Sequence, residues 1–568
     1  MIFEIISTID LLNTTSGIYI GQTVNYRDII IQQYLGIEYG RIKKRFDRAE
    51  PIIQENNTII NATSFGPVCK PTISSCTINR DKYPLTTSCS VNYGIFSITS
   101  SPNEQCLFLN VFIPIINNDN NTNQRKKPIF MWIHGGSAQV GTGNVFDGTI
   151  LAAVGNIIVV TFNFRLNLFG FLSSGDERLE GNLGLYDQSM VLNWIYENGE
   201  ILGGDIERIT VGGHSAGAPH AYYLAKSPFN QGRIRRLILQ SGCPFNIWSH
   251  IKADQAIERF NVVVNDNQCG MMLTFEEKLQ CLRDKDYDLI AEYDHHTYAS
   301  SNHTNVVING NYMNEFREVL DSNDTLVDID ILIGSNDDED DCSQSSDCYC
   351  SLFYNYSRLV SDILFYNDYY RFLIQRIQYS NKTFIYEYSY RTSQEHPTPC
   401  NDYLYRNNLV GHFAELEYTW GTPLLFEKTN YTNNLIPLIN YIPYELNLFD
   451  NYTNEQIEFS ELIIEQWSNF IKYGQPNSTK FENQWLPIIN ISNGLIMHLK
   501  MNESQMKQFE IPSNVQFWMN TCSIIENHMI NNLNDQASFD EISIPICVCT
   551  SLFLVLILQD PFLIISFL

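Results

Sequence analysis

The sequence predicts an α/β fold in which a mostly parallel central sheet carries helices on both faces. Stretches rich in Ile, Val and Phe, such as residues 129–133, alternate along the 568 residues with helical stretches such as 188–196. A hydrophobic content of 44% is ample for a core. Runs rich in Asn and Asp, at 117–123 and 337–341, indicate loops between these elements.

The most informative motif is the run Gly-His-Ser-Ala-Gly at residues 213–217, which has the spacing of a nucleophile elbow. It follows the β-rich run 209–211 and precedes the helix-compatible run 220–225, which is the context of strand, sharp turn and helix that the motif needs. Glycines suit so tight a corner because a Cβ would clash there. A Gly-rich turn with a capping serine is the alternative, so the case for Ser215 depends on its neighbours.

A second turn, His-Gly-Gly-Ser at 134–137, directly follows the predicted strand 129–133. Such a turn supplies backbone N–H donors that stabilise a tetrahedral oxyanion, typically by a few kcal/mol per donor. An ordinary strand-ending turn is the alternative. Because the elbow follows in the chain order of an α/β-hydrolase, the sequence favours an oxyanion hole formed by the N–H groups of Gly136, Ser137 and Ala216.

Ordered landmarks from about Gly36 to about Trp518 resemble those of the type-B carboxylesterase family, which also contains the cholinesterases. The landmarks lie at residues 104–111, 163–166, 181–188, 203–205, 239–242 and 474–477. The resemblance implies an α/β-hydrolase domain over residues 1–539. It also implies a broad-specificity serine esterase or lipase that acts through an acyl-enzyme on a small-molecule or lipid ester.

The resemblance further implies an acid and a base for Ser215. Residues 331–340 are similar to the family's G-x-N-x-D-E-G segment after a strand, which assigns the acid to Glu339. Asp337 and Asp338 are the alternative acids. The non-catalytic alternative is that these residues form a solvated acidic run. Residues 411–416 are similar to the H-x-x-E-[LI] segment, which assigns the base to His412. In such a triad the histidine takes the serine proton, and the carboxylate fixes the histidine tautomer.

The 14 cysteines predict an oxidising compartment. The resemblance implies that Cys69 pairs with Cys106 and that Cys269 pairs with Cys281. The group of Cys342, Cys348 and Cys350 has no second cysteine pair at zinc-finger spacing, so we expect further disulfides rather than a metal site. We also expect no cofactor. The cysteines outside the two pairs include Cys76, Cys89, Cys342, Cys348 and Cys350.

Charge and the chain ends bear on location. A net charge of −27 argues against a nucleic-acid partner. Residues 1–6 lack a basic region, so no signal peptide is evident, yet the cysteines favour extracellular or secretory placement. The tail 540–568 contains the apolar runs 544–558 and 562–568 and predicts a membrane element. A GPI signal fits it better than a spanning helix, which needs about 20 apolar residues; a packed core strand and a mistranslated end are the alternatives.

Three departures from the family pattern limit what the resemblance implies about the substrate. His214 replaces the glutamate that commonly precedes the serine in cholinesterases, the loop from Cys69 to Cys106 contains no tryptophan, and only 73 positions separate Glu339 from His412. The family also contains proteins that keep the fold and lose the triad, so a non-catalytic adhesion or structural protein is the alternative. The complete set of triad candidates favours the enzyme, because adhesion has no physical need for a strained serine.

Overall fold

The computed structural model of the chain describes the central sheet and the helices that cover it. The described residues are 5–6, 11–53, 58–70, 102–115, 126–287, 290, 306–308, 326, 328–337, 339, 362–390, 410, 412–425, 452–479, 484–490, 494–513, 515–516 and 519–520. Several sequence predictions lie outside these residues: the loop 117–123, the further cysteines Cys76, Cys89, Cys342, Cys348 and Cys350, and the tail 540–568.

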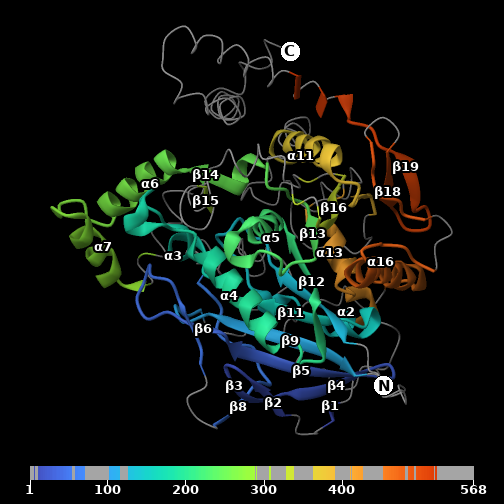
Figure 1. The fold of residues 1–568 in the computed structure, drawn as a ribbon, viewed down its shortest axis with the longest axis horizontal. Helices are drawn as coiled ribbons and strands as arrows, with labels where there is room; N and C mark the ends of the chain where they lie inside the picture. The colour runs from blue at the N-terminus through green and yellow to red at the C-terminus, as the bar shows by residue number, and fades with distance from the viewer. Residues whose placement is uncertain are drawn as a thin grey trace, which may run out of the picture.

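A twelve-stranded sheet runs through the centre of the molecule (Figure 1). In spatial order its strands are β1 (Ile5–Ile6), β4 (Gln22–Tyr26), β5 (Ile29–Glu38), β9 (Phe108–Ile115), β11 (Ile158–Phe162), β10 (Lys127–Ile133), β12 (Gly204–His214), β13 (Arg236–Gln240), β16 (Asp330–Asn336), β17 (Thr383–Tyr388), β18 (Leu495–Leu499) and β19 (Gln505–Gln508). The block from β11 to β18 is parallel, and the strands on either side pair antiparallel. The predicted mostly parallel centre is confirmed.

Helices cover both faces of this sheet, as predicted. They are α2 (Thr149–Gly155), α3 (Asn167–Phe171), α4 (Leu183–Asn198), α5 (Gly217–Lys226), α6 (Ala253–Asp266), α7 (Phe275–Asp284), α11 (Asn367–Tyr379), α13 (Ala414–Thr419), α14 (Thr422–Leu425) and α16 (Asn454–Tyr473), together with a π-helical turn at Asp362–Tyr366. Shorter strands form small separate sheets: β2 (Leu11–Thr14) with β3 (Gly17–Ile20) and β8 (Ile59–Asn61), β6 (Gly40–Arg41) with β7 (Glu50–Pro51), and β14 (His250–Lys252) with β15 (Val306–Ile308).

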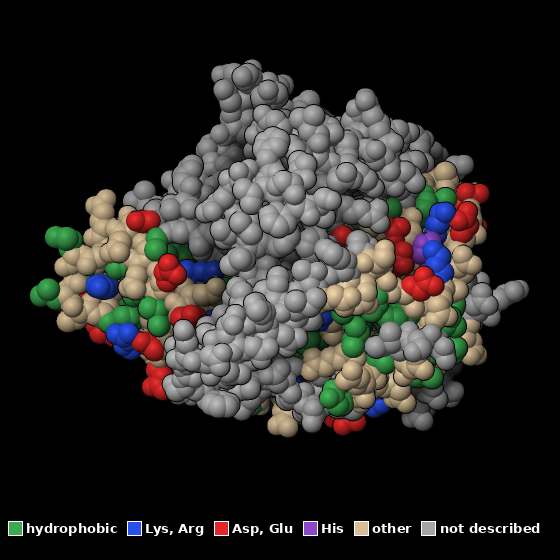
Figure 2. Space-filling model, turned by 90° about the horizontal axis from the view of Figure 1, so that it is seen from above, with side chains coloured by type: hydrophobic (Ala, Val, Ile, Leu, Met, Phe, Trp, Pro, Cys, Tyr) green, Lys and Arg blue, Asp and Glu red, His purple; other side chains and the backbone are tan. Residues whose placement is uncertain are grey.

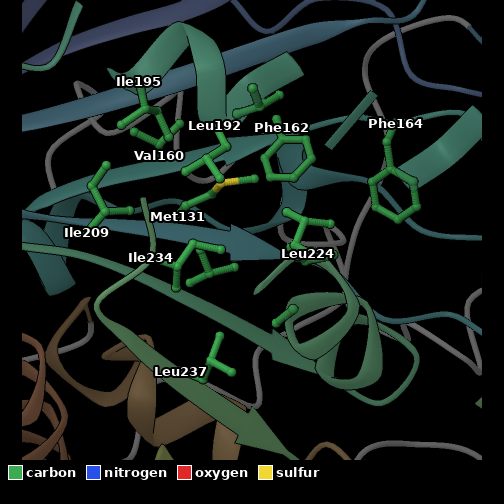
Figure 3. Packing of buried hydrophobic residues seen from close by; sticks show 14 of the residues in the cluster. Met131, Val160, Phe162, Phe164, Leu192, Ile195, Ile209, Leu224, Ile234 and Leu237 are labelled. Atoms are coloured by element: carbon green, nitrogen blue, oxygen red, sulfur yellow. The ribbon is translucent and has the colours of Figure 1, made fainter. Parts of the chain in front are cut away.

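The two faces have separate cores because successive side chains of a strand point in opposite directions. Met131 on β10 belongs to the core that includes Leu192 of α4 and residues of α5, and Figure 3 shows this packing at close range. Its neighbour Trp132 belongs to the opposite core with α2 and Trp467 of α16. Burial on both faces explains why β10 is a continuous apolar run rather than an alternating one.

A buried ion pair ties two of the family landmarks together. Arg165, in the loop after β11, donates from Nε and Nη2 to the carboxylate of Asp187 on α4 at 2.8 and 2.7 Å. The two side chains are 3% and 0% exposed, so the guanidinium is paired rather than solvated. A bidentate pair of this kind fixes direction as well as distance. It therefore holds α4 against the loop that follows β11.

Helix α16 shows how local sequence sets an element. Thr453 accepts a hydrogen bond from the Gln456 N–H at 3.2 Å, and the Gln456 side chain accepts one from the Thr453 N–H at 2.9 Å. This capping box satisfies donors that the first turn would otherwise leave unpaired. Gly474 ends the helix with φ +74°, a left-handed conformation that glycine adopts without a Cβ penalty.

Helices α6 and α7 project from the side of the molecule, at the left in Figures 1 and 2. The disulfide Cys269–Cys281 ties the end of the loop between them to α7. Met271 and Leu273 at the tip of that loop are 91% and 94% exposed, and apolar side chains are visible there in Figure 2. Across the described ranges, no helix combines the length and apolar character needed to cross a bilayer.

The structure also contains the disulfide Cys69–Cys106, between segments 37 positions apart. We expect non-reducing peptide mapping to recover both bonded pairs. Replacing Cys69 and Cys106 by Ala should lower the free energy of unfolding by about 2–4 kcal/mol, because a loop of this length gains much conformational entropy when its closure is lost. Replacing the buried free Cys243 by Ala is the control, since it closes no loop. Recovery of Cys69, Cys106, Cys269 and Cys281 as free thiols would contradict both pairings.

Candidate active site

The predicted elbow adopts the strained geometry that lifts a serine above a sheet. Strand β12 ends at His214, α5 begins at Gly217, and Ser215 between them has φ +53°. This left-handed conformation is costly for a residue with a Cβ. The Ser215 N–H donates to the carbonyl of Gln240 on β13 at 2.9 Å, which holds the strained residue to the neighbouring strand.

Glycine is required on both sides of Ser215 because the backbone folds back on itself. A Cβ added to Gly213 would lie 2.1 Å from the carbonyl oxygen of Gly217, and one added to Gly217 would lie 2.2 Å from that of Ile133. Both distances are far inside van der Waals contact. The second contact also shows that α5 begins directly against the end of β10, which carries the other predicted turn.

That other turn lies beside the elbow. A Cβ added to Gly135 would fall 3.0 Å from the Ser215 Cβ. The two residues that follow are left-handed, with φ +113° at Gly136 and +56° at Ser137. The N–H groups of Gly136, Ser137 and Ala216 donate to no other residue in the part of the chain that the structure describes. Unpaired backbone donors next to a nucleophile are what an oxyanion hole requires.

The structure also brings together Glu339 and His412. The His412 Nδ1 lies 2.5 Å from Glu339 Oε2, and Glu339 Oε1 accepts a hydrogen bond from the Asn336 N–H at 2.7 Å. Both side chains are buried. The Glu339 side chain comes from the segment after β16, and His412 from the turn before α13. Pairing through Nδ1 fits the triad arrangement, in which Nε2 faces the serine.

The link between Ser215 and His412 is looser. No hydrogen bond joins the Ser215 Oγ to His412 among the described residues. The His412 ring instead packs on His214, the residue before the serine, with the ring centroids 4.6 Å apart. Serine–histidine hydrogen bonds are often long in a ligand-free enzyme and tighten when substrate binds, so this geometry is compatible with a triad.

The alternative acid Asp337 lies in a different cluster. The Asp337 carboxyl group lies near Glu387 on β17 and His498 on β18. One potential metal-ligand atom from each of the three side chains lies within 4.8 Å of the other two. Partial loss of hydration and a hydrogen bond with Glu387 raise the pKa of Asp337 to about 7, although the residue keeps an exposed surface. In the described ranges this is the one group of three such side chains that could hold a metal ion. Asp338, the other alternative, lies outside the described residues.

Sequence reasoning missed a buried polar network beneath the triad. Glu415, on α13, is fully buried, and its Oε2 accepts a hydrogen bond from the Asn336 side-chain amide at 2.7 Å. Its Oε1 accepts longer bonds from Gln240 and Ser241, at 3.3 and 3.4 Å. Burial raises the pKa of Glu415 to about 7, and the charge of Glu339 adds to this rise. The H-x-x-E segment was the available signal, because it places Glu415 in the first turn of α13, three positions after His412.

A parallel sheet that presents a serine at a strand-to-helix turn is the architecture of α/β-hydrolases. The family described as the carboxylesterase family matches residues 10–351 and 342–518, and the chain belongs to it.

Similar proteins within the family include neuroligins. The chain is 32% identical to neuroligin-3 of Mus musculus over 330 residues, which are 54% of this chain and 39% of that protein. It is 27% identical to neuroligin-2 of Mus musculus over 430 residues, which are 66% of this chain and 49% of that protein. The matches therefore span less than half the length of these curated relatives.

The elbow geometry predicts a strong effect of Gly217→Ala. The new methyl group would meet the Ile133 carbonyl, so we expect a loss of at least about 2 kcal/mol in the free energy of unfolding. Gly232→Ala is the matched control: its φ of +79° carries a cost of about 1 kcal/mol, but nothing lies within 4 Å of the added Cβ. Urea denaturation of both variants measures the difference. Equal losses would mean that the close contact at Gly217 is absent.

Proposed function

We propose that this chain is a serine carboxylic-ester hydrolase. The observation that carries the proposal is the short Glu339–His412 pair beside a serine held at φ +53°, with unbonded backbone N–H groups around it. Each of these features costs stability or leaves a donor unsatisfied. Together they match the needs of acyl transfer at Ser215.

The proposed reaction has two halves. His412 takes the proton of Ser215 as the hydroxyl attacks an ester carbonyl, and Glu339 stabilises the resulting imidazolium. The N–H groups of Gly136, Ser137 and Ala216 receive the oxyanion. The alcohol then leaves with a proton from His412, and water attacks the acyl-enzyme to release the acid and restore the serine.

The proposed substrates are small-molecule or lipid esters without a preference for a cationic alcohol. The loop from Cys69 to Cys106 offers no tryptophan to hold a quaternary ammonium by cation–π attraction. The residue before the serine is His214, so the glutamate that commonly stands at this position in cholinesterases is absent. A nucleic-acid substrate is excluded from the proposal because the chain carries a net charge of −27.

Substitution of the triad tests this proposal. Ser215→Ala should lower the hydrolysis of short p-nitrophenyl esters by at least ~10³-fold and abolish labelling by a fluorophosphonate, while the circular dichroism spectrum is retained. Glu339→Gln should lose most of the activity, because the amide cannot stabilise the imidazolium. Asp337→Asn is the matched control and should retain activity, since Asp337 contacts Glu387 and His498 rather than His412. Undiminished turnover by folded Ser215→Ala would refute the assignment.

Adhesion is a second candidate function, and it has the support of the comparisons. The relatives that the chain matches include neuroligins. The exposed Met271 and Leu273 on the α6–α7 projection are compatible with a protein partner. This function would make residues 1–539 a display scaffold and the tail 540–568 its membrane attachment.

Expression in suspension cells with and without residues 540–568 tests the second function. If the chain is a displayed adhesion protein, the full chain should appear on the cell surface and aggregate cells. The truncated chain should appear in the medium, and Ser215→Ala should aggregate cells as well as the unsubstituted chain. Equal secretion of both forms with no surface fraction would contradict the attachment, and the absence of aggregation by displayed chain would contradict adhesion.

A further inference from the structure

His214 is a buried imidazole that the proposed reaction does not use. It is the last residue of β12, its side chain is fully buried, and neither ring nitrogen has a hydrogen-bond partner among the described residues. A buried polar group without a partner is rare in a folded protein. The nearest complementary atom is Glu415 Oε1, 3.7 Å from His214 Nε2.

Glu415 likewise lacks a short hydrogen bond at its Oε1 atom among the described residues. It is as deeply buried as His214, and the hydrogen bonds that its Oε1 accepts from Gln240 and Ser241 are long, at 3.3 and 3.4 Å. Burial raises the pKa of Glu415 to about 7, whereas burial, together with His412, lowers the pKa of His214 well below its usual value. Near neutral pH the Glu415 carboxyl group is therefore protonated in part of the molecules, and the His214 imidazole has an unprotonated nitrogen that can accept this proton.

We propose that His214 and Glu415 share one proton and act as a positioning pair for His412. The His214 ring packs on the His412 ring, while Glu415 is linked through the side-chain amide of Asn336 to the backbone N–H that holds Glu339. The pair thus contacts His412 through the His214 ring and is linked to Glu339 through Asn336. Its role in hydrolysis rests on the proposed function, but its shared proton does not.

Few other ionisable groups face this pair in the described residues. His412 faces both members, Glu339 faces Glu415 from the segment after β16, and Tyr386 and Tyr388 of β17 lie within electrostatic range of Glu415. Burial raises the pKa of each tyrosine well above its usual value, so both stay neutral between pH 5 and 9. Among the carboxyl groups that these interactions place at the pair, Glu415 is the one whose pKa burial raises to about 7.

Glu415→Gln is the decisive variant because it keeps the shape and the hydrogen bond to Asn336 but removes the titrating proton. Glu417→Gln is its matched control on the same helix. Burial also raises the pKa of Glu417 to about 7, but its carboxylate accepts a hydrogen bond from Tyr452 and has no contact with His214. If a folding defect caused the effects, both variants would show them.

The measurement is the pH titration of the imidazole ¹⁵N resonances in protein labelled at histidine, assigned with His214→Phe and His412→Gln. We expect the His214 Nε2 signal to show a step near pH 7 that Glu415→Gln abolishes and Glu417→Gln retains. We also expect Glu415→Gln to move the midpoint of the His412 titration to lower pH by at least about 0.5 unit, because loss of a nearby anion disfavours the imidazolium. A His214 signal without a step, or a step that survives Glu415→Gln, would overturn the proposal.

Fluorophosphonate labelling of the unsubstituted chain, run in parallel, separates this inference from the proposed function. Failure to label Ser215 would count against hydrolysis alone, because the ¹⁵N titration still reports whether the pair shares a proton. Successful labelling with no coupling between His214 and Glu415 would count against the pair alone. If Ser215 is labelled and the pair shares a proton, the pH at which the labelling rate is half of its maximum should be lower for Glu415→Gln than for the unsubstituted chain and for Glu417→Gln.

Discussion

The active site depends on one close approach, that of α5 to the end of β10. Gly217 can begin its helix against the carbonyl of Ile133 only because it has no Cβ, and Gly213 faces the same restriction on the other side of the turn. This contact forces Ser215 into a left-handed conformation and brings the turn at Gly135 against it. The proposed nucleophile and the proposed oxyanion donors are therefore placed by the same backbone packing.

Much of this arrangement could be predicted from the sequence because it is local. The strand 209–211, the helix 220–225 and the strand 129–133 are each set by a short apolar pattern, and the structure contains them within β12, α5 and β10. The prediction for residues 188–196 found only the middle of α4, which extends from Leu183 to Asn198. Its first turn is glycine-containing and buried, so a helical period is least visible there.

The rest of the site could not be read from local pattern. Glu339 and His412 are 73 positions apart, and only the family resemblance proposed their pairing. The cluster of Asp337, Glu387 and His498 depends on strand register, which sets Glu387 directly opposite His498. The role of Glu415 depends on His214, the last residue of β12, whose Nε2 lies 3.7 Å from Glu415 Oε1. Contacts of this kind follow from topology, which a single sequence does not specify.

The buried polar groups separate the two functions on physical grounds. A scaffold for adhesion needs a rigid sheet and an exposed partner surface, and the apolar cores on both faces supply rigidity without any carboxyl or imidazole group. Yet the chain places two carboxyl groups and two imidazoles together at the carboxyl ends of its central strands, where each carries a desolvation cost. Replacing such a cluster by apolar side chains of similar volume is often neutral or stabilising. Its presence beside a strained serine is therefore better explained by proton transfer than by stability, and this is the physical ground for proposing hydrolysis for a chain whose relatives include neuroligins.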